Sequence, residues 1–223
     1  MKTTKYFALA ALTLALGACS DENEFYGDLK QITVEAGFGA SSRVATNGLS
    51  SIFEADDAIG VYVWTGATTL PDAAAGYVAN NVTNTFDGKN WTATPQMLWK
   101  DAETPHYFLS VYPQTDILTT TTYTLDATDQ EKSDLLVATN FGKDNGGIVA
   151  QSNPVPLAFG HVMAKLRVNI KFNDEFTTAP TVEHVTVGAH ATATIDWQTA
   201  TATATGNATG IELPALATAA QGY

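Results

Sequence analysis

The sequence has little positive charge and almost no cysteine. Eleven Lys and Arg stand against 23 Asp and Glu, so the formal net charge is −12. A surface of that sign repels phosphate groups, and we therefore expect no nucleic-acid partner. Cys19 is the only cysteine, which excludes a disulfide within the chain.

Helical periodicity is also missing. After residue 18, no stretch of ten or more residues places its apolar side chains on one helical face. Short runs of β-branched and aromatic residues are instead separated by Gly, Asn and Thr, and charged residues make up only 15 % of the chain. This composition is typical of a secreted all-β protein of one large or two small domains.

The motifs of catalysis and metal binding are absent as well. His184 and His190 are six residues apart, which matches neither a helical zinc pair nor a zinc finger. The acidic stretches 56–57 and 144–146 do not fit the calcium-binding loop, and we interpret them as turns. No Gly-x-Ser-x-Gly elbow occurs. We therefore predict a protein that is not an enzyme and has no catalytic residues, metal or cofactor.

Residues 1–18 have the features of a signal peptide. Lys2 and Lys5 precede an apolar run over 6–16, which is too short to span a bilayer. Small residues then lead to Cys19, and this pattern resembles the lipobox of bacterial lipoproteins. The resemblance implies that the Cys19 thiol receives a diacylglycerol, that the new N-terminus is acylated, and that lipid anchors the protein in the cell outer membrane. The alternative is an ordinary secretory signal.

Residues 19–30 begin with an acidic run at 21–24. One interpretation is a solvated tether between the lipid and the first domain. The run also resembles the signal that directs lipoproteins of Bacteroides-type bacteria to the outer face of the outer membrane. Removal of residues 1–18 leaves nine basic and 23 acidic residues, a net charge of −14.

The stretch 159–172 shows the clearest strand pattern. Every second residue from Val162 to Phe172 is apolar, and most of the residues between them are polar. A period of two predicts a long strand with one buried and one exposed face, in an antiparallel sheet.

Shorter patterns predict the other strands. We expect strands over 31–40, 58–64, 97–99, 106–112, 120–125 and 134–139, with further strands at 182–187 and 193–197. Asp87-Gly88 predicts a hairpin turn, and the Gly-, Ala- and Asn-rich stretch 65–85 predicts a long loop. The Ala/Thr run 200–209 specifies its register weakly.

Several of these stretches together resemble the fimbrillin family, which includes pilus subunits and fimbrial anchor and tip proteins. The matching stretches are 42–46, 57–62, Trp99 with 107–113, 134–138 and 159–166. The resemblance implies a transthyretin-like antiparallel β-sandwich over 31–175 and the start of a second, truncated β-sandwich domain over 176–223. It also implies a surface-exposed subunit for pilus assembly and cell adhesion. Its expected partners are other pilin subunits and a host or bacterial surface ligand.

Arg43 lies in a loop of small residues just after the first predicted strand. In the fimbrillin family, a trypsin-like protease cuts after an arginine in this loop when the subunit polymerises. The resemblance therefore implies cleavage between Arg43 and Val44, which releases the strand that carries Ile32, Val34 and Phe38. A strand donated by another subunit would then refill the groove. In an anchor subunit the strand stays in place, and the sequence leaves stalk, tip and anchor roles open.

The tryptophans support an alternative from another functional class. Exposed indole rings on a surface lipoprotein would form a platform for stacking sugars, which predicts a carbohydrate-binding protein. Tryptophans that flank strands also pack in the core, and we consider that use the more frequent one. The four residues in question are Trp64, Trp91, Trp99 and Trp197.

Overall fold

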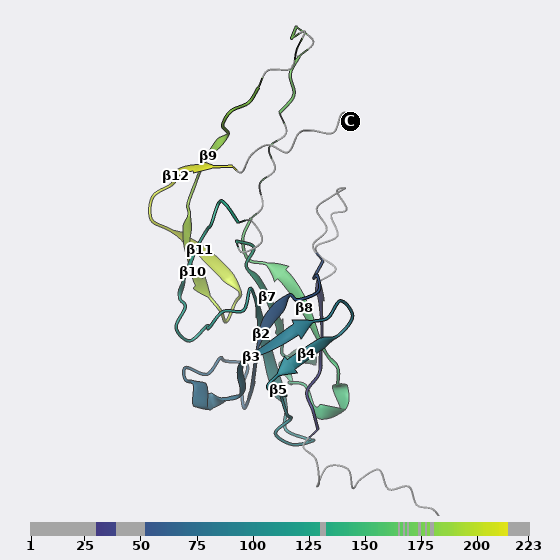
Figure 1. Cartoon of the computed structure of the whole chain (residues 1–223). Helices are drawn as coiled ribbons and strands as arrows, with labels where there is room; N and C mark the ends of the chain where they lie inside the picture. The colour runs from purple at the N-terminus through teal and green to yellow at the C-terminus, as the bar shows by residue number, and fades with distance from the viewer. Residues whose placement is uncertain are drawn as a thin grey trace, which may run out of the picture.

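The structure is a computed structural model that describes residues 30–38, 52–129, 133–164, 166, 168, 170–173, 175–176, 178 and 181–213. Its described part is built from β-strands, with three single-turn 3₁₀ helices at Ala74–Gly76, Lys143–Asn145 and Ala150–Ser152. Figure 1 shows one larger β body with a smaller ribbon above it. The predicted all-β sandwich is confirmed.

Seven strands form the main sheet, in the order β1-β8-β7-β5-β2-β3-β4. Neighbours pair antiparallel except β1 and β8, which run parallel from Val34 opposite Val155 to Phe38 opposite Phe159. The strands are β1 (Val34–Phe38), β2 (Ala58–Thr65), β3 (Tyr77–Phe86), β4 (Trp91–Thr94), β5 (His106–Tyr112), β7 (Leu136–Asn140) and β8 (Val155–His161).

This sheet curls until its two edges meet. Gln31, just before β1, forms a bridge with Leu98, which lies beyond β4. The curl encloses one apolar core, which includes Ile32, Val61 and Phe108. Closure of the sheet leaves few unpaired backbone groups along its edges.

A second layer covers the outer face of the sheet. Its strands β11 (Thr201–Thr205), β10 (Thr192–Asp196) and β6 (Thr122–Thr124) pair in that order. Ile195 and Trp197 pack there against Tyr62 and Leu109 in a second core. Because the central strands are buried on both faces, β2 and β5 are buried along almost their whole length and are mostly apolar rather than alternating.

The remaining strands, β9 (Thr186–Ala189) and β12 (Thr209–Glu212), form a separate two-stranded antiparallel ribbon. The division into domains at residue 176 stays a prediction. Across that position, β10 pairs with β6, so the strand at 192–196 shares a layer with the first part of the chain.

Several predicted elements are confirmed. The strands at 58–64 and 106–112 are β2 and β5, and Asp87-Gly88 makes the turn between β3 and β4. The Asp87 carboxylate accepts hydrogen bonds from the backbone of Lys89 and Asn90, at 2.8 and 2.6 Å, and Gly88 has a φ of +92°. This Asx arrangement holds the hairpin closed.

The predicted loop over 65–85 is wrong in its second half, which is strand β3. The Asn and Thr side chains of β3 hide the alternation that marks a strand. Backbone pairing with β2 on one side and β4 on the other nevertheless stabilises it. The predicted strand over 159–172 is also wrong beyond His161, where β8 ends. The described residues from Val162 to Asn173 lie in no strand, and Leu166 is 62 % exposed.

Candidate strand-exchange site

The segment 30–38, which contains β1, is bound along one side by β8 and the turn before it. Thr33 accepts a hydrogen bond from the amide of Val155 at 2.9 Å. The Asn153 side chain bonds the backbone on both sides of Ile32: its oxygen accepts from the Thr33 amide at 2.9 Å, and its nitrogen donates to the Gln31 carbonyl at 3.2 Å. These contacts extend the parallel pairing beyond the strand itself.

The opposite side of the same segment is bound by the residues after β4. The Ile32 amide donates to the Met97 carbonyl at 2.9 Å, and the Trp99 amide donates to the Lys30 carbonyl at 3.0 Å. The Gln96 side chain adds a bond to the Ile32 carbonyl at 3.2 Å. The segment therefore lies between β8 and the residues that follow β4, and it closes the curled sheet.

Side chains along the segment alternate between core and solvent. Ile32 is 1 % exposed and Val34 is 6 % exposed, whereas Gln31, Thr33 and Glu35 face solvent. The period of two is what a strand with one buried face requires. Ile32 and Val34 therefore lie on the buried face of the segment.

Phe38, at the end of β1, is half-buried against an aromatic cluster. Its ring stacks on Phe53 at a centroid distance of 4.9 Å. Phe53 also meets Phe159 of β8 edge-on at 5.3 Å and Trp91 of β4 edge-on at 5.0 Å. Residues from both sheet edges thus meet around Phe53, beside the end of the segment.

Beneath the segment, Trp99 packs edge-on against the buried ring of His106 at 4.9 Å. His106 Nδ1 donates to the Thr104 carbonyl at 2.7 Å, and Nε2 accepts from the Lys100 amide at 3.2 Å. Burial lowers the pKa of His106, and this pair of bonds suits the neutral ring. The histidine therefore has a structural role, and we assign it no chemistry.

The other predicted site residues fall outside the described part of the chain. These are Cys19, Arg43 and Val44. Lipidation at Cys19 and cleavage between Arg43 and Val44 therefore stay predictions.

The predicted sugar-stacking platform is wrong for these tryptophans. Trp64, Trp99 and Trp197 are 1 %, 0 % and 7 % exposed. Trp91 is half-buried and stacks on Phe86 at 5.0 Å. Rings packed in this way offer no open faces for a sugar.

Within the described ranges, no cluster of three or more His, Cys, Asp or Glu residues is arranged to hold a metal ion. Two histidines instead make single pairs with carboxylates: His161 Nδ1 lies 2.7 Å from Asp134, and His184 Nδ1 lies 2.5 Å from Glu212. No helix in the described part is both long and apolar enough to cross a membrane.

The sequence patterns did not predict which residues bind segment 30–38. Asn153 and the stretch 96–99 bind the segment from distant positions, and Asn153 lies 120 residues from Thr33. The apolar run at 97–99 predicted a strand there, but nothing in it indicated pairing with residues 30–32. Such contacts leave no local pattern in the sequence.

Comparisons with known proteins support this architecture. The sequence profile of a family described as fimbrillin-like matches residues 42–223. The crystal structure of a candidate cell adhesion protein from Bacteroides uniformis ATCC 8492 is similar, with a TM-score of 0.53 and 25 % identity over 83 % of this chain and 70 % of that one. The crystal structure of a candidate cell adhesion protein from Bacteroides ovatus ATCC 8483 is also similar, with a TM-score of 0.53. The two sequences are 20 % identical, and the match covers 82 % of this chain and 70 % of that one. No curated protein matches the chain.

Proposed function

The chain belongs to the fimbrillin-like family, and from that premise we propose that it is a surface-anchored structural subunit for pilus assembly and cell adhesion. The similar structure from B. uniformis, a candidate cell adhesion protein, supports the same class of function. A structural role also agrees with the buried aromatic residues, which serve packing rather than binding or catalysis.

Assembly, in this proposal, proceeds by strand exchange at β1. The observation that carries it is the position of segment 30–38, bound on one side by Val155 and Asn153 and on the other by Met97 and Trp99. Removal of the segment would leave a groove with two rows of unpaired backbone groups and an uncovered core. A strand donated by another subunit satisfies both, through main-chain pairing and alternate side chains.

Release of the segment would follow cleavage between Arg43 and Val44. Arg43 is five residues beyond the end of β1, so a cut there separates the whole segment from the rest of the domain. Arg43 and Arg167 are the only arginines in the chain, which suits a protease specific for arginine. Lipid on Cys19 would hold the uncut subunit at the outer membrane until then.

The test is Arg43→Ala in the full-length chain expressed in a Bacteroides host. We expect polymer to disappear from gels and an uncut, folded monomer to accumulate. Arg43→Lys separates arginine-specific from general basic cleavage. Lys30→Ala is the matched control, because Lys30 precedes β1 and a cut there would leave the strand attached. Unchanged polymer that retains residues 30–38 in Arg43→Ala would refute strand exchange at this site.

A further inference from the structure

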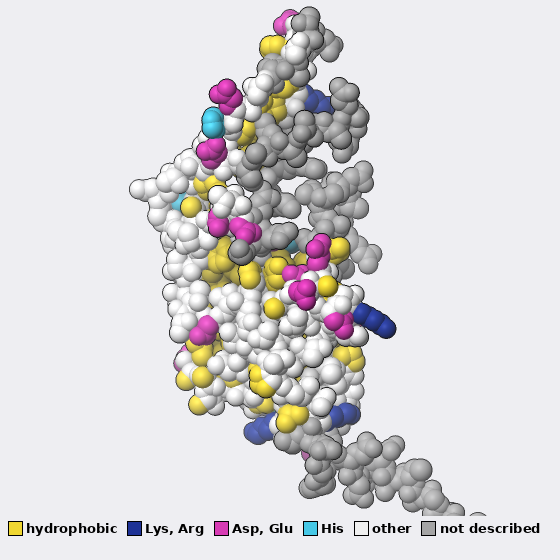
Figure 2. Space-filling view, in the orientation of Figure 1, with side chains coloured by type: hydrophobic (Ala, Val, Ile, Leu, Met, Phe, Trp, Pro, Cys, Tyr) yellow, Lys and Arg dark blue, Asp and Glu magenta, His cyan; other side chains and the backbone are white. Residues whose placement is uncertain are grey.

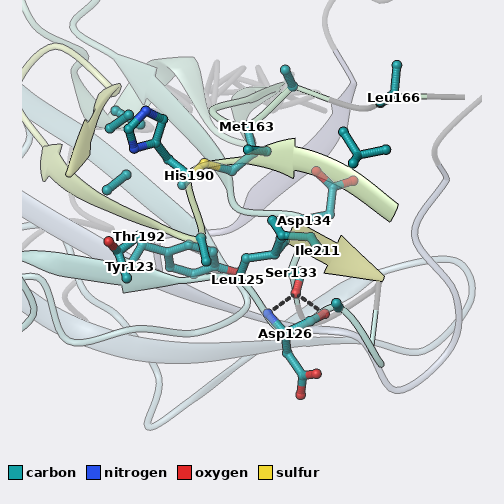
Figure 3. A pocket seen from close by; sticks show the side chains of 18 of the residues that line it. Tyr123, Leu125, Asp126, Ser133, Asp134, Met163, Leu166, His190, Thr192 and Ile211 are labelled. Carbon is teal, nitrogen blue, oxygen red and sulfur yellow. Dashed lines mark hydrogen bonds between the residues drawn. The ribbon is translucent and has the colours of Figure 1, made fainter. Parts of the chain in front are cut away.

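A hollow of about 610 Å³ is lined both by the larger β body and by the two-stranded ribbon of β9 and β12. The ribbon contributes Val187 and Ile211, which lie opposite each other in its register. Figure 3 shows Ile211 around the hollow with Tyr123, Leu125 and Met163. A hollow of this size with a mostly apolar lining is typical of a site for a small organic molecule.

Small side chains of the second layer leave room in the hollow. Ala193 of β10 and Ala202 and Ala204 of β11 belong to the lining. Their exposure rises along this row, because Ala193 is buried, Ala202 is half-buried and Ala204 is exposed. Solvent therefore reaches the hollow at Ala204, and a ligand can enter there.

The hydroxyl groups of the hollow are bonded within the chain. The Ser133 hydroxyl donates to the Asp126 carbonyl at 2.7 Å and accepts from the Asp126 amide at 2.8 Å, as the dashed lines in Figure 3 show. The Thr192 hydroxyl donates to the Thr205 carbonyl at 3.0 Å. The charged side chains are therefore the groups that select a polar ligand atom.

Those charged side chains are acidic. Asp126, Asp134 and Glu212 line the hollow together with His190, and none of the described residues that line it is Lys or Arg. Figure 2 shows hydrophobic and acidic side chains next to one another where the larger body meets the upper ribbon. An apolar hollow of this charge repels carboxylates and phosphates and attracts cations.

Asp134 is the best placed of the three carboxylates. Its side chain is 33 % exposed, whereas that of Glu212 is 64 % exposed, and solvent screens a half-buried charge less. In Figure 3 the carboxylate of Asp126 points away from the other labelled side chains. Asp134 lies 2.7 Å from His161 through Oδ1 alone, and a carboxylate has about four acceptor sites, so it can also accept from a ligand.

An aromatic ring lies close to this carboxylate. Burial raises the pKa of the half-buried Tyr123, and the charge of Asp134 acts in the same direction. An ammonium group beside both residues can form a charge-assisted hydrogen bond with the carboxylate and lie against the face of the ring. The polar end of the hollow therefore suits an organic cation.

We propose that this hollow binds a small amphipathic cation, an apolar molecule that carries one ammonium group. The ammonium group pairs with Asp134 beside Tyr123, and the apolar body lies against Met163 and Ile211. The site is independent of strand exchange at β1, since no residue of segment 30–38 lines it.

The test is calorimetric titration of the full chain with octylammonium below its micelle-forming concentration. Octanoate has a similar tail and the opposite charge, and ethylammonium has the same charge and almost no tail. We expect octylammonium to bind at least about tenfold more tightly than either probe, because it alone satisfies both the apolar wall and the carboxylate. Added salt should weaken its binding. Equal binding of octanoate, or no binding of octylammonium, would overturn the proposal.

Chain variants locate the binding. Asp134→Asn should weaken octylammonium binding about tenfold, the usual effect of losing one charge-assisted hydrogen bond. Glu103→Gln is the matched control, because it removes the same charge from an exposed residue outside the hollow. An equal loss in both variants would assign the effect to net charge and overturn the site.

Ala204→Phe tests the hollow itself. The larger side chain should fill the space and block octylammonium, while the urea midpoint stays unchanged because Ala204 is exposed. Should that variant unfold, Ala204→Leu replaces it. Undiminished binding in a folded Ala204 variant would place the ligand elsewhere. A concentration-dependent dimer that the Ala204 variant dissolves, without octylammonium binding to the parent chain, would assign the hollow to a second copy and overturn the proposal.

Discussion

The indole nitrogen of Trp91 donates a hydrogen bond to the backbone carbonyl of Ala36 at 3.3 Å. Trp91 begins β4 and Ala36 lies in the middle of β1, which are the two end strands of the seven-stranded sheet. The contact joins elements that are far apart in sheet order and 55 residues apart in sequence. This hydrogen bond helps to hold β1 in place and to close the curled sheet.

Trp91→Phe should therefore loosen β1 without emptying the aromatic cluster. The phenyl ring can still pack on Phe53 and Phe86, so we expect a loss of about 1 kcal/mol in the free energy of unfolding, the usual worth of one hydrogen bond. Trp197→Phe is the control, because its indole nitrogen donates to the Thr120 carbonyl, away from β1. Amide exchange in β1 should accelerate only in Trp91→Phe. Equal acceleration in both variants would contradict the assignment.

Ile32→Ala should be among the more damaging substitutions in the segment. The side chain is almost fully buried, so its truncation should cost about 2–5 kcal/mol, measured by urea unfolding. Glu35→Ala lies in the same strand but faces solvent, and it should change stability by less than about 0.5 kcal/mol. A similar small loss in both would show that the segment contributes little to the core.

Gly88→Ala should weaken the hairpin between β3 and β4. Its φ of +92° is a conformation that disfavours side chains, and the nearest atom to an added Cβ would be that of Ala55 at 3.8 Å. The cost is thus one of backbone conformation, about 1–2 kcal/mol. Gly160→Ala in β8 is the matched control, since it has no positive φ and nothing within 4 Å. Thermal unfolding of both variants measures the difference, and equal midpoints would refute the argument.

Local patterns predicted the central strands β2 and β5, because both are rich in apolar residues along their length and are buried on both faces. In segment 30–38, Ile32 and Val34 instead alternate with polar neighbours, as a strand with one buried face requires. The same pattern did not predict a strand correctly beyond His161, where Leu166, Val168, Ile170 and Phe172 are exposed. Periodicity states which side chains need a partner surface, but it does not state that the partner is present.

The sequence did not predict which strands pair with one another in the sheet. The residues of β3 gave the pattern of a loop because their Asn and Thr side chains mask a strand that pairs on both sides. Residues 97–99 bind residues 30–32 on the side of the segment opposite β8, and only the curl of the sheet brings these two stretches together. Such relationships arise from the closed topology, and no stretch of sequence encodes them alone.

His106 should make the fold sensitive to mild acid. Burial lowers the pKa of its ring in the folded state below the ordinary value of 6.5, with Lys100 acting in the same direction, while the Thr104 carbonyl and Asp101 oppose the shift. Above pH 6.5 the ring is neutral in both states, and its contribution to stability is fully present. As the pH falls below 6.5, His106 takes up a proton in the unfolded chain but stays neutral in the folded chain. The free energy of unfolding therefore declines as the pH falls toward the lowered pKa of the folded state, by at most about 1.4 kcal/mol per pH unit.

Urea unfolding between about pH 7.5 and 5 measures this dependence of stability on pH. The slope should shrink in His106→Gln, even if that variant is less stable at neutral pH, and should persist in His190→Gln, whose ring is exposed. Asp101 does not contribute to this dependence between about pH 7.5 and 5. Hydrogen bonds from Thr104 lower the pKa of its carboxyl below 3.8, so the stability that Asp101 contributes is lost only in stronger acid. An unchanged slope in His106→Gln would assign the acid sensitivity to other groups.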